Sequence, residues 1–419
     1  MTSPIHWRPP LAVLLSAFAS GLPLTVALAD PAPTYRTLLE QAQVNAPRLA
    51  ESRSDIARSE GLARQAATRL NPTLGVDIEN FSGSGPFRGT GLTETTARVE
   101  QTVEFGGKRL ARAAAGRAEV DAARARSTQV QADFAFDLAD AYAQAEAAER
   151  RVVLAEEAVA LAVEDARVAN ALVRAGKEAD LRAVQARAAV QAARAARDEA
   201  QAASAAAFGR LTALAGSARP LTHIVDSLLD HADRSEAIPQ PDPTTAPSYL
   251  AAQAAREAAA QRVQVERTRG APDVAVSLGV RRFNSDKATA MVGGFSMPFP
   301  VFDRNRGAIS AAQAELAGAE ARLNAARLDA EADSRSATAR AVAAHSRIAA
   351  ARESEMAADE AYRLTRIGYQ GGKLSLTELN AARRALTEAR AQTLNARLER
   401  LGAEAMLARL QGVAPFGDQ

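Results

Sequence analysis

Hydrophobic and polar positions alternate with a period of two in four short stretches of this chain. In the first of them, Leu74, Val76 and Ile78 alternate with small or polar residues, which is the pattern of a strand with one apolar and one polar face. Pro72 marks its beginning, because the residue before a proline avoids the helical conformation. The alternation predicts four strands, at about residues 72–81, 95–105, 273–283 and 288–301.

Most of the remaining apolar positions follow a helical period over unusually long segments. From Phe134 to Val173 they recur with alternating spacings of four and three residues, which is typical of a coiled-coil seam. A proline-free segment of about 70 residues would extend roughly 100 Å as a helix. The pattern predicts shorter helices at about residues 34–70 and 247–269, and four long ones at about 107–175, 178–215, 305–368 and 375–411.

The order of these elements occurs twice, which predicts an internal duplication. The segment from Asn71 to Glu79 returns as Ala271 to Gly279, and the long helices break at Gly176 and at Gly372. Glycine suits a tight reversal, so each pair of helices is expected to be antiparallel. The predicted organisation is a first repeat at 30–220, a proline-rich connection at 221–246 with a short helix near Leu221–Ala232, a second repeat at 247–412 and a tail at 413–419.

Composition and charge narrow the class of protein. Aromatic residues make up only 4% of the chain and alanine-rich runs dominate, so slim, closely packed helices are expected rather than a thick globular core. Basic and acidic residues interleave along the helices, and the formal net charge is +2. This pattern indicates solvated helix faces and argues against a nucleic-acid partner.

The first 29 residues have the pattern of an export signal. Arg8 supplies a positive charge, the stretch from Leu11 to Ala19 is apolar, and Ala27 and Ala29 are small residues before Asp30. We therefore predict a signal peptide at residues 1–29. The chain contains no cysteine, which excludes disulfides and lipid attachment through a cysteine, so packing or oligomerisation must stabilise the exported protein.

Four strands with one apolar face require a partner surface. An exported chain can place such a face against lipid, but even small packed barrels need about eight strands. Three copies of the chain would supply twelve strands, and the long helices would continue from them as a tube. The sequence therefore predicts a mainly α-helical protomer, with four long antiparallel coiled-coil helices and four strands, that assembles into a larger barrel.

Over nearly all of the mature chain, the sequence resembles the TolC-type outer-membrane efflux channels. The duplicated plan, the stretch from Val99 to Arg109 and the segment from Tyr369 to Leu379 carry the resemblance. The first stretch is similar in particular to the heavy-metal branch, of the Czc and Cus type. The resemblance implies a homotrimer with a twelve-stranded β-barrel in outer-membrane lipid and an α-helical barrel in the periplasm.

The same resemblance implies a passive conduit for heavy-metal cations or other small toxic compounds, with no enzymatic activity. Its implied partners are a periplasmic adaptor protein, which opens the periplasmic tip, and an inner-membrane pump of the RND type. Three features depart from the family pattern: no cysteine follows the signal, Arg182 stands where the first tip has an acidic residue, and Glu378 replaces the usual aspartate.

The two helical reversals are the main candidate functional site. The residues expected to contact the adaptor are Arg174, Gly176, Lys177, Gly368, Gly371, Gly372, Lys373 and Ser375. Arg182, Tyr369 and Glu378 form the candidate gate, with Glu378 lining the constriction. Because Arg182 and Glu378 occupy equivalent positions in the two repeats, we hypothesise an ion pair between neighbouring coiled coils. The alternative is that both reversals are ordinary helix–helix turns.

A second candidate site is the stretch Gly106, Gly107, Lys108 and Arg109, which we assign to the junction between barrel and tunnel. It lacks the upstream glycine and the hydroxyl residue after lysine that a phosphate-binding loop requires.

No cofactor, metal site or catalytic residue is predicted. His223 and His231 lie among aspartates, but a separation of eight residues does not bring both onto one helical turn. His6 falls in the signal, and His345 stands alone in a long helix, without a nucleophile or a paired carboxylate in the pattern. Two alternative functions stay open, a periplasmic adaptor and a coiled-coil scaffold without a pore.

Overall fold

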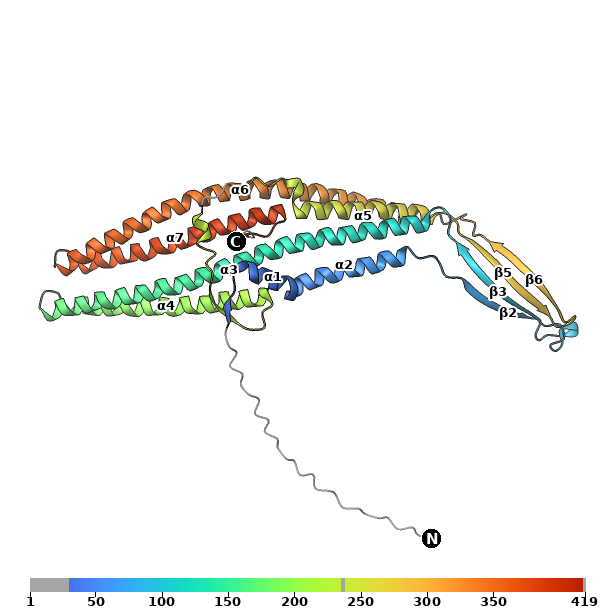
Figure 1. The fold of residues 1–419 in the computed structure, drawn as a ribbon, viewed down its shortest axis with the longest axis horizontal. Coiled ribbons are helices and arrows are strands. Elements are labelled where there is room, and N and C mark those ends of the chain that lie inside the picture. The colour runs from blue at the N-terminus through green and yellow to red at the C-terminus, as the bar shows by residue number, and fades with distance from the viewer. Residues whose placement is uncertain (1–29, 235–237, 417–419) are drawn as a thin grey trace, which may run out of the picture.

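The computed structural model describes residues 30–234 and 238–416, so the predicted signal peptide lies outside the described residues. The protomer is long and narrow, with a helical bundle that leads at one end into a four-stranded sheet (Figure 1). None of the helices within the described ranges is both long and apolar enough to cross a membrane.

The same order of elements occurs in both halves of the chain. The first half contains α1 (Tyr35–Asn45), α2 (Pro47–Ala66), β2 (Thr73–Glu79), β3 (Glu94–Val103), α3 (Lys108–Arg174) and α4 (Asp180–Ala215). The second half contains α5 (Pro247–Arg269), β5 (Val274–Phe283), β6 (Ala288–Ser296), α6 (Arg306–Gln370) and α7 (Leu376–Gln411). Local signals set several ends: Thr34 caps α1 with its side chain, and Pro47 occupies the first turn of α2.

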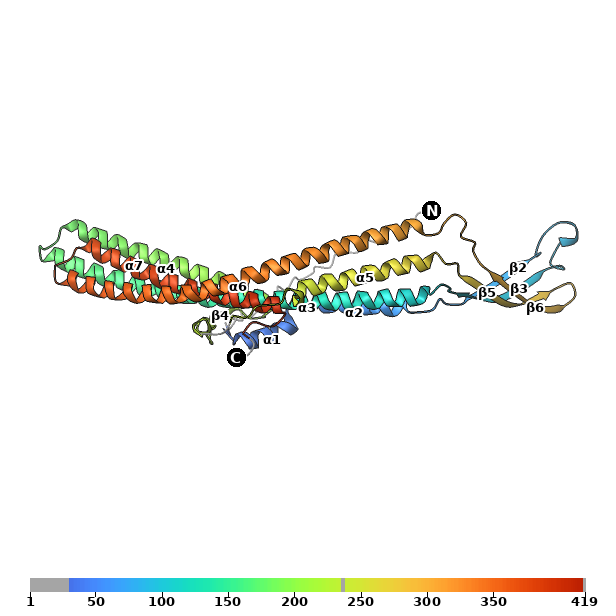
Figure 2. The same ribbon diagram turned by 90° about the horizontal axis from the view of Figure 1, so that it is seen from above.

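The helices form a layered bundle around α3. Near the sheet, α3 packs between α2 and α5, and α5 also packs on α6. Towards the other end, α3 pairs with α4, α6 pairs with α7, and α3 contacts α7 (Figures 1 and 2). The bundle therefore contains two antiparallel helical hairpins, α3–α4 and α6–α7, that lie against each other within one protomer.

The four strands form one antiparallel sheet in the order β2-β3-β5-β6. Residues opposite each other share a face, so Leu74, Val99 and Leu278 lie on the same side. This side is apolar and exposed, with Leu74 at 77% and Phe295 at 83% of their full accessibility. One face of the sheet is therefore an uncovered apolar surface.

The opposite face of the sheet is polar and carries its own ion pairs. Arg98 Nη1 lies 2.7 Å from Asp77 Oδ2. Arg281 pairs with Glu79 at 3.2 Å and with Glu94 at 3.0 Å. One face of the sheet therefore suits an apolar environment, and the other suits an aqueous one.

The last strand is shorter than the sequence predicted. The expectation was a strand to about residue 301, but β6 ends at Ser296. Pro298 and Pro300 follow it, and because proline has no backbone N–H, neither can donate to a strand ladder.

The connection between the two halves contains a strand instead of the predicted short helix near Leu221–Ala232. β4 (Leu221–Ile224) pairs in parallel with β1 (Asp30–Ala32), and 3₁₀ turns follow at His231–Asp233 and Pro243–Thr245. A hydrogen bond from the Ile224 amide to the Glu149 carboxylate (3.1 Å) fixes the strand on α3. An amide used in this way is unavailable to a helix, and the pairing partner β1 is far away in sequence.

The largest buried cluster lies at the middle of the bundle, where α1, α3, α4, α7 and the connection meet. Tyr142 and Leu211 are fully buried there. The Tyr35 hydroxyl donates to the Ala135 carbonyl (3.0 Å), and the Tyr142 hydroxyl donates to the Asp226 carbonyl (2.9 Å). The connection is therefore fastened to α3 by both apolar packing and hydrogen bonds.

Glu146 of α3 is a buried carboxylate that fastens the same connection. It accepts hydrogen bonds from the Ser227 hydroxyl (2.5 Å) and from the amides of Leu228 (2.8 Å) and Leu229 (3.0 Å). Burial raises the pKa of the Glu146 carboxyl, and these hydrogen bonds oppose the rise only in part. Ionised Glu146 therefore costs folding free energy, which is recovered when the group binds a proton.

We expect Glu146→Gln to be tolerated and Glu146→Ala to be destabilising. The side-chain carbonyl oxygen of glutamine can still accept hydrogen bonds from the backbone N–H groups of Leu228 and Leu229. Alanine leaves both N–H groups buried without partners, which costs about 2–5 kcal/mol. Because the folded pKa is raised, the advantage of glutamine over wild type should be largest at neutral pH and shrink as pH falls through the folded pKa towards the unfolded one. Denaturant unfolding across this pH range measures the difference in free energy of unfolding between Glu146→Gln and wild type. An advantage of glutamine that grows on acidification would contradict a raised pKa of Glu146.

Candidate functional site

Both helical hairpins reverse through the same turn, at the end of the bundle farthest from the sheet (Figures 1 and 2). Gly176 and Gly372 have φ angles of 68° and 71°, in the left-handed region that favours glycine. Four amides close the two turns with bonds of 2.9 Å to helix carbonyls: Gly176 to Val173, Lys177 to Leu172, Gly372 to Tyr369 and Lys373 to Gly368.

The predicted tip residues divide between these two turns. Arg174, Lys177 and Lys373 are exposed, and Gly371 adds a bond from its amide to the Ile367 carbonyl (3.0 Å). Gly368 is covered by Leu374, whose Cδ1 would lie 2.6 Å from a Cβ at that position. Each turn is thus a compact unit with basic residues on its outside.

The helices that leave the two turns are capped differently. Ser375 and Glu378 form a capping box at the start of α7: the Glu378 amide donates to Ser375 Oγ (3.3 Å) and the Ser375 amide to Glu378 Oε2 (2.7 Å). The backbone bond from Ser375 holds the pKa of Glu378 below its usual value. At the start of α4, Arg182 instead lies 3.6 Å from Glu178. Within the described protomer, Arg182 and Glu378 do not pair with each other.

Tyr369 is buried inside the protomer, with only 1% of its surface exposed. It packs with Tyr362, Leu376 and Leu379 in a cluster that also contacts the apolar side chains of α3. Burial raises the pKa of Tyr369. This tyrosine therefore belongs to the contact between the two hairpins.

The same contact contains a buried ion pair that the sequence analysis missed. Arg383 Nη1 of α7 lies 3.1 Å from Asp165 Oδ2 of α3, and their side chains are only 11% and 5% exposed. The Tyr362 hydroxyl is buried beside this pair without a hydrogen bond of normal geometry. Burial raises the pKa of Asp165, while the positive charges of Arg383 and Arg366 act in the opposite direction. A polar cluster thus links the two hairpins near their turns.

This pair is one of a series of polar side-chain contacts between α3 and α7. Moving from the turns towards the middle of the bundle, the contacts between the two helices are Arg383–Asp165 (3.1 Å), Arg390–Glu157 (2.7 Å), Arg151–Asn395 (2.8 Å) and Arg409–Asp133 (2.6 Å). The two hairpins are therefore joined by polar contacts along their length as well as by apolar packing.

The signal for Asp165 was present in the sequence but weak. It directly precedes Ala166, one of the positions of the predicted apolar seam, and a carboxylate buried there needs a partner. The partner, Arg383, is 218 residues away, so no local pattern could identify it.

At the opposite end of the bundle, Gly106 and Gly107 turn the chain from β3 into α3. Their φ angles are 71° and 77°. A Cβ on Gly106 would lie 2.6 Å from the Cβ of Ala271, whereas a Cβ on Gly107 would meet nothing within 4 Å. Gly106 thus allows a close approach between the two halves of the chain.

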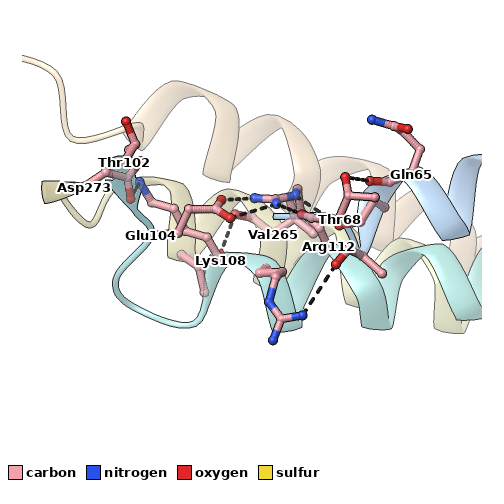
Figure 3. Close-up of polar contacts among 12 residues, drawn as sticks. Gln65, Thr68, Thr102, Glu104, Lys108, Arg112, Val265 and Asp273 are labelled. Carbon is pink, nitrogen blue, oxygen red and sulfur yellow. Dashed lines mark hydrogen bonds and ion pairs between the residues drawn. The ribbon is translucent and has the colours of Figure 1, made fainter. Parts of the chain in front are cut away.

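Charged pairs close this junction (Figure 3). Lys108 Nζ lies 2.7 Å from Asp273 Oδ1, which joins the first turn of α3 to the residue before β5. Arg112 donates to both carboxylate oxygens of Glu104 and also to the carbonyls of Ala66 (3.3 Å) and Thr68 (3.4 Å) at the end of α2.

Arg109 makes a longer bond to the Ala67 carbonyl (3.5 Å). The two arginines therefore satisfy carbonyls at the end of α2 that its own helix leaves unpaired.

The three histidines within the described residues have different surroundings, and His6 lies outside the described residues. His223 is exposed on β4, while His231 is buried against the ring of Phe416. His345 Nδ1 lies 3.2 Å from Arg400 Nη1, which makes it part of a polar contact between α6 and α7. Within residues 30–234 and 238–416, no group of three or more His, Asp or Glu side chains is arranged to hold a metal ion.

Comparison with known proteins identifies this architecture. The family described as outer membrane efflux protein matches residues 38–217 and again residues 244–413. The nickel and cobalt resistance protein CnrC of Cupriavidus metallidurans is 41% identical over 71% of this chain and 71% of its own length. The nickel-cobalt-cadmium resistance protein NccC of Alcaligenes xylosoxydans is 40% identical over 70% of this chain and 66% of its own length.

Among solved structures, the outer membrane protein VceC of Vibrio cholerae has the same fold. It superposes with a TM-score of 0.76 over 91% of this chain and 96% of its own, at 21% sequence identity.

Proposed function

Since the chain belongs to the outer membrane efflux protein family, we propose that it forms the outer-membrane channel of a tripartite efflux system. The observation that carries the proposal is the sheet, which has one exposed apolar face, one polar face and two unpaired edge strands. An exported protein can leave such a face uncovered only where lipid covers it. This surface also argues against the adaptor and scaffold alternatives, which would remain in water.

We propose that three protomers close the sheet into a twelve-stranded barrel. The edge strands β2 and β6 present free N–H and C=O groups that must pair in a membrane. If β6 of one protomer pairs with β2 of the next, three four-stranded sheets close without an edge. The apolar face then contacts lipid, and the polar face with its Arg98–Asp77 and Arg281–Glu94 pairs lines the lumen.

The helices would continue this barrel into the periplasm. The layer α2-α3-α5-α6 is open at both sides of the protomer, as expected for one third of a ring. The repeated order of elements supports an internal duplication, so each repeat contributes one strand hairpin and one helical hairpin to a tube of pseudo-sixfold symmetry.

We propose that the turns at Gly176 and Gly372 form the periplasmic tip, which a periplasmic adaptor contacts and opens. The exposed Arg174, Lys177 and Lys373 would face this partner. In the closed tip, the Asp165–Arg383 pair holds the two hairpins together, and opening requires their separation. An ion pair between Arg182 and Glu378 of neighbouring protomers stays a hypothesis of the same kind.

The cargo that we propose is divalent heavy-metal cations. Relatives of this chain are described as nickel, cobalt and cadmium resistance proteins, which supports this class. We propose that the chain acts as a passive conduit for these cations. Selection of the cargo then lies with an inner-membrane pump.

Metal accumulation in cells tests this function. In a host that carries a matching pump and adaptor but lacks their channel, expression of the full chain should lower cell-associated nickel or cobalt after a metal load. Expression of the chain without the pump is the matched control and should leave accumulation unchanged. Equal accumulation with and without the chain, at normal levels of the protein in the outer membrane, would reject the proposal.

A further inference from the structure

Basic residues concentrate where the sheet meets the helices. We define the junction zone as residues 64–72, 104–112, 264–273 and 297–307, which come together between the strands and the helical bundle (Figures 1 and 2). It contains nine Lys or Arg and four Asp or Glu, a net charge of +5, although the whole chain has a net charge of only +2. The remainder of the protein is therefore slightly acidic.

The acidic residues of the junction zone are already engaged. Glu104 pairs with Arg112, Asp273 with Lys108, and Glu266 with Arg269. Asp303 accepts a hydrogen bond from the Asn305 amide (2.8 Å). These ion pairs involve three of the nine Lys and Arg side chains of the junction zone.

Five exposed arginines of the zone have no carboxylate partner in the described protomer: Arg64, Arg69, Arg267, Arg304 and Arg306. They come from α2, from α5 and from the segment that leads into α6. Arg304 makes one bond, from its Nε to the Pro300 carbonyl (3.3 Å). Their charge is free to bind an external anion.

Large apolar side chains are exposed at the same level of the molecule. Phe302 is fully exposed, Phe299 is 80% exposed, and Phe105 and Leu110 are also exposed. The apolar face of the sheet begins directly beyond them. A band with aromatic rings and long cationic side chains, next to an apolar surface, is typical of a membrane–water boundary.

We propose that the junction zone binds the phosphate groups of anionic phospholipids in the periplasmic leaflet of the outer membrane. This inference rests on the proposed function, which puts the sheet in the membrane and the helices in the periplasm. Phe299 and Phe302 then lie among the lipid headgroups and upper chains, while the arginines bind the phosphates. The contact fixes the depth of the barrel in the bilayer.

Two other occupants fit the zone less well. An adaptor bound to the helical tips would lie at the opposite end of the bundle (Figure 1). In the proposed trimer the zones of neighbouring protomers adjoin at their edges, and because each carries a charge of +5, a neighbouring protomer adds positive charge instead of neutralising the arginines. An anionic lipid surface complements the charge and also accepts the exposed rings.

Lipid preference of the reconstituted protein tests the inference. The full-length protein is placed in bilayers of phosphatidylcholine and phosphatidylglycerol, and its preference between spin-labelled forms of the two lipids is measured. One well-placed cation is worth about 1 kcal/mol at an anionic membrane, so we expect about a five-fold preference for phosphatidylglycerol. High salt should reduce the preference, because it screens charges at the surface.

Two triple variants remove the same charge from different places. Arg267→Gln/Arg304→Gln/Arg306→Gln removes three of the five arginines without a carboxylate partner and should reduce the preference to about two-fold or less. Arg187→Gln/Arg194→Gln/Arg210→Gln removes three exposed arginines of α4 and should keep the wild-type preference. Conductance is recorded for each protein to show that the channel is intact.

The outcomes separate the inference from the function on which it rests. Conducting channels with no preference for phosphatidylglycerol, or with equal loss in both variants, would overturn the headgroup assignment and leave the channel standing. Failure of the wild-type protein to insert, or absence of conductance both in the wild type and in an Asp165→Leu variant that lacks the buried ion pair of the tip, would overturn the channel, and the headgroup assignment with it.

Discussion

Asp165→Leu should open the closed tip. The substitution leaves the Arg383 guanidinium buried against α3 without its carboxylate, and breaking one partner of a buried pair costs about 3–5 kcal/mol. Separation of the hairpins returns Arg383 to water, so the variant shifts the equilibrium towards the open tip by a factor of about 10²–10⁴. In planar bilayers, we expect the wild-type channel to be mostly closed and the variant to conduct continuously.

Two control variants test whether loss of the buried Asp165–Arg383 pair is the cause of the opening. Asp165→Leu/Arg383→Leu removes both charges, and because an apolar pair can replace a buried ion pair, closure should return. Glu164→Gln changes a neighbouring carboxylate whose ion pair is with Arg167 of its own helix, at the protein surface, and it should behave like wild type. Similar conductance for Asp165→Leu and Glu164→Gln would show that the buried pair does not hold the tip.

Gly106→Ala should weaken the joint between the sheet and the helices. The new Cβ would lie 2.6 Å from the Cβ of Ala271, on a residue whose φ is 71°. Left-handed backbone and overpacking together cost about 2–4 kcal/mol. The expected result is a lower denaturation midpoint and less folded protein in the outer membrane.

Gly107→Ala provides the matched control for this joint. Its φ of 77° imposes the same backbone strain, but nothing lies within 4 Å of the new Cβ. Its cost should therefore be about 1–2 kcal/mol, the backbone term alone. Equal losses in the two variants would mean that the contact with Ala271 contributes nothing.

Local patterns in the sequence were sufficient to predict the long helices, their turns and the strands β2 and β5. The alternation around Leu74 and Leu278, the long alanine-rich segments and the glycines at 176 and 372 correspond to β2, β5, the long helices and their turns. In each case the signal and the structure involve neighbouring residues. The family assignment followed from the same features together with the stretch from Val99 to Arg109.

Contacts between residues far apart in the sequence could not be predicted from local patterns. β4 forms because it pairs with β1, nearly two hundred residues earlier in the chain, whereas the local sequence had been interpreted as a helix. The Asp165–Arg383 pair joins two helices from different repeats. Its residues are inconspicuous in a chain with many interleaved charges.

Glu378 shows a different kind of omission, because the local signal for its capping role was available. Ser375 and Glu378 have the spacing of a capping box, and the structure contains both of its hydrogen bonds. From the sequence, Glu378 is predicted to line the constriction. A carboxylate that caps its own helix is held at the helix end, so any role at a constriction must be compatible with that bond.

The central claim is that three copies of this chain make one conduit, and recordings from purified protein of known mass test it most directly. Light scattering of the detergent-purified protein should give the mass of three chains, and the same sample should produce discrete conductance steps in planar bilayers. The Asp165→Leu variant should raise the open probability without changing that mass. A monomeric protein, or a trimer that produces no conductance even in this variant, would contradict the account.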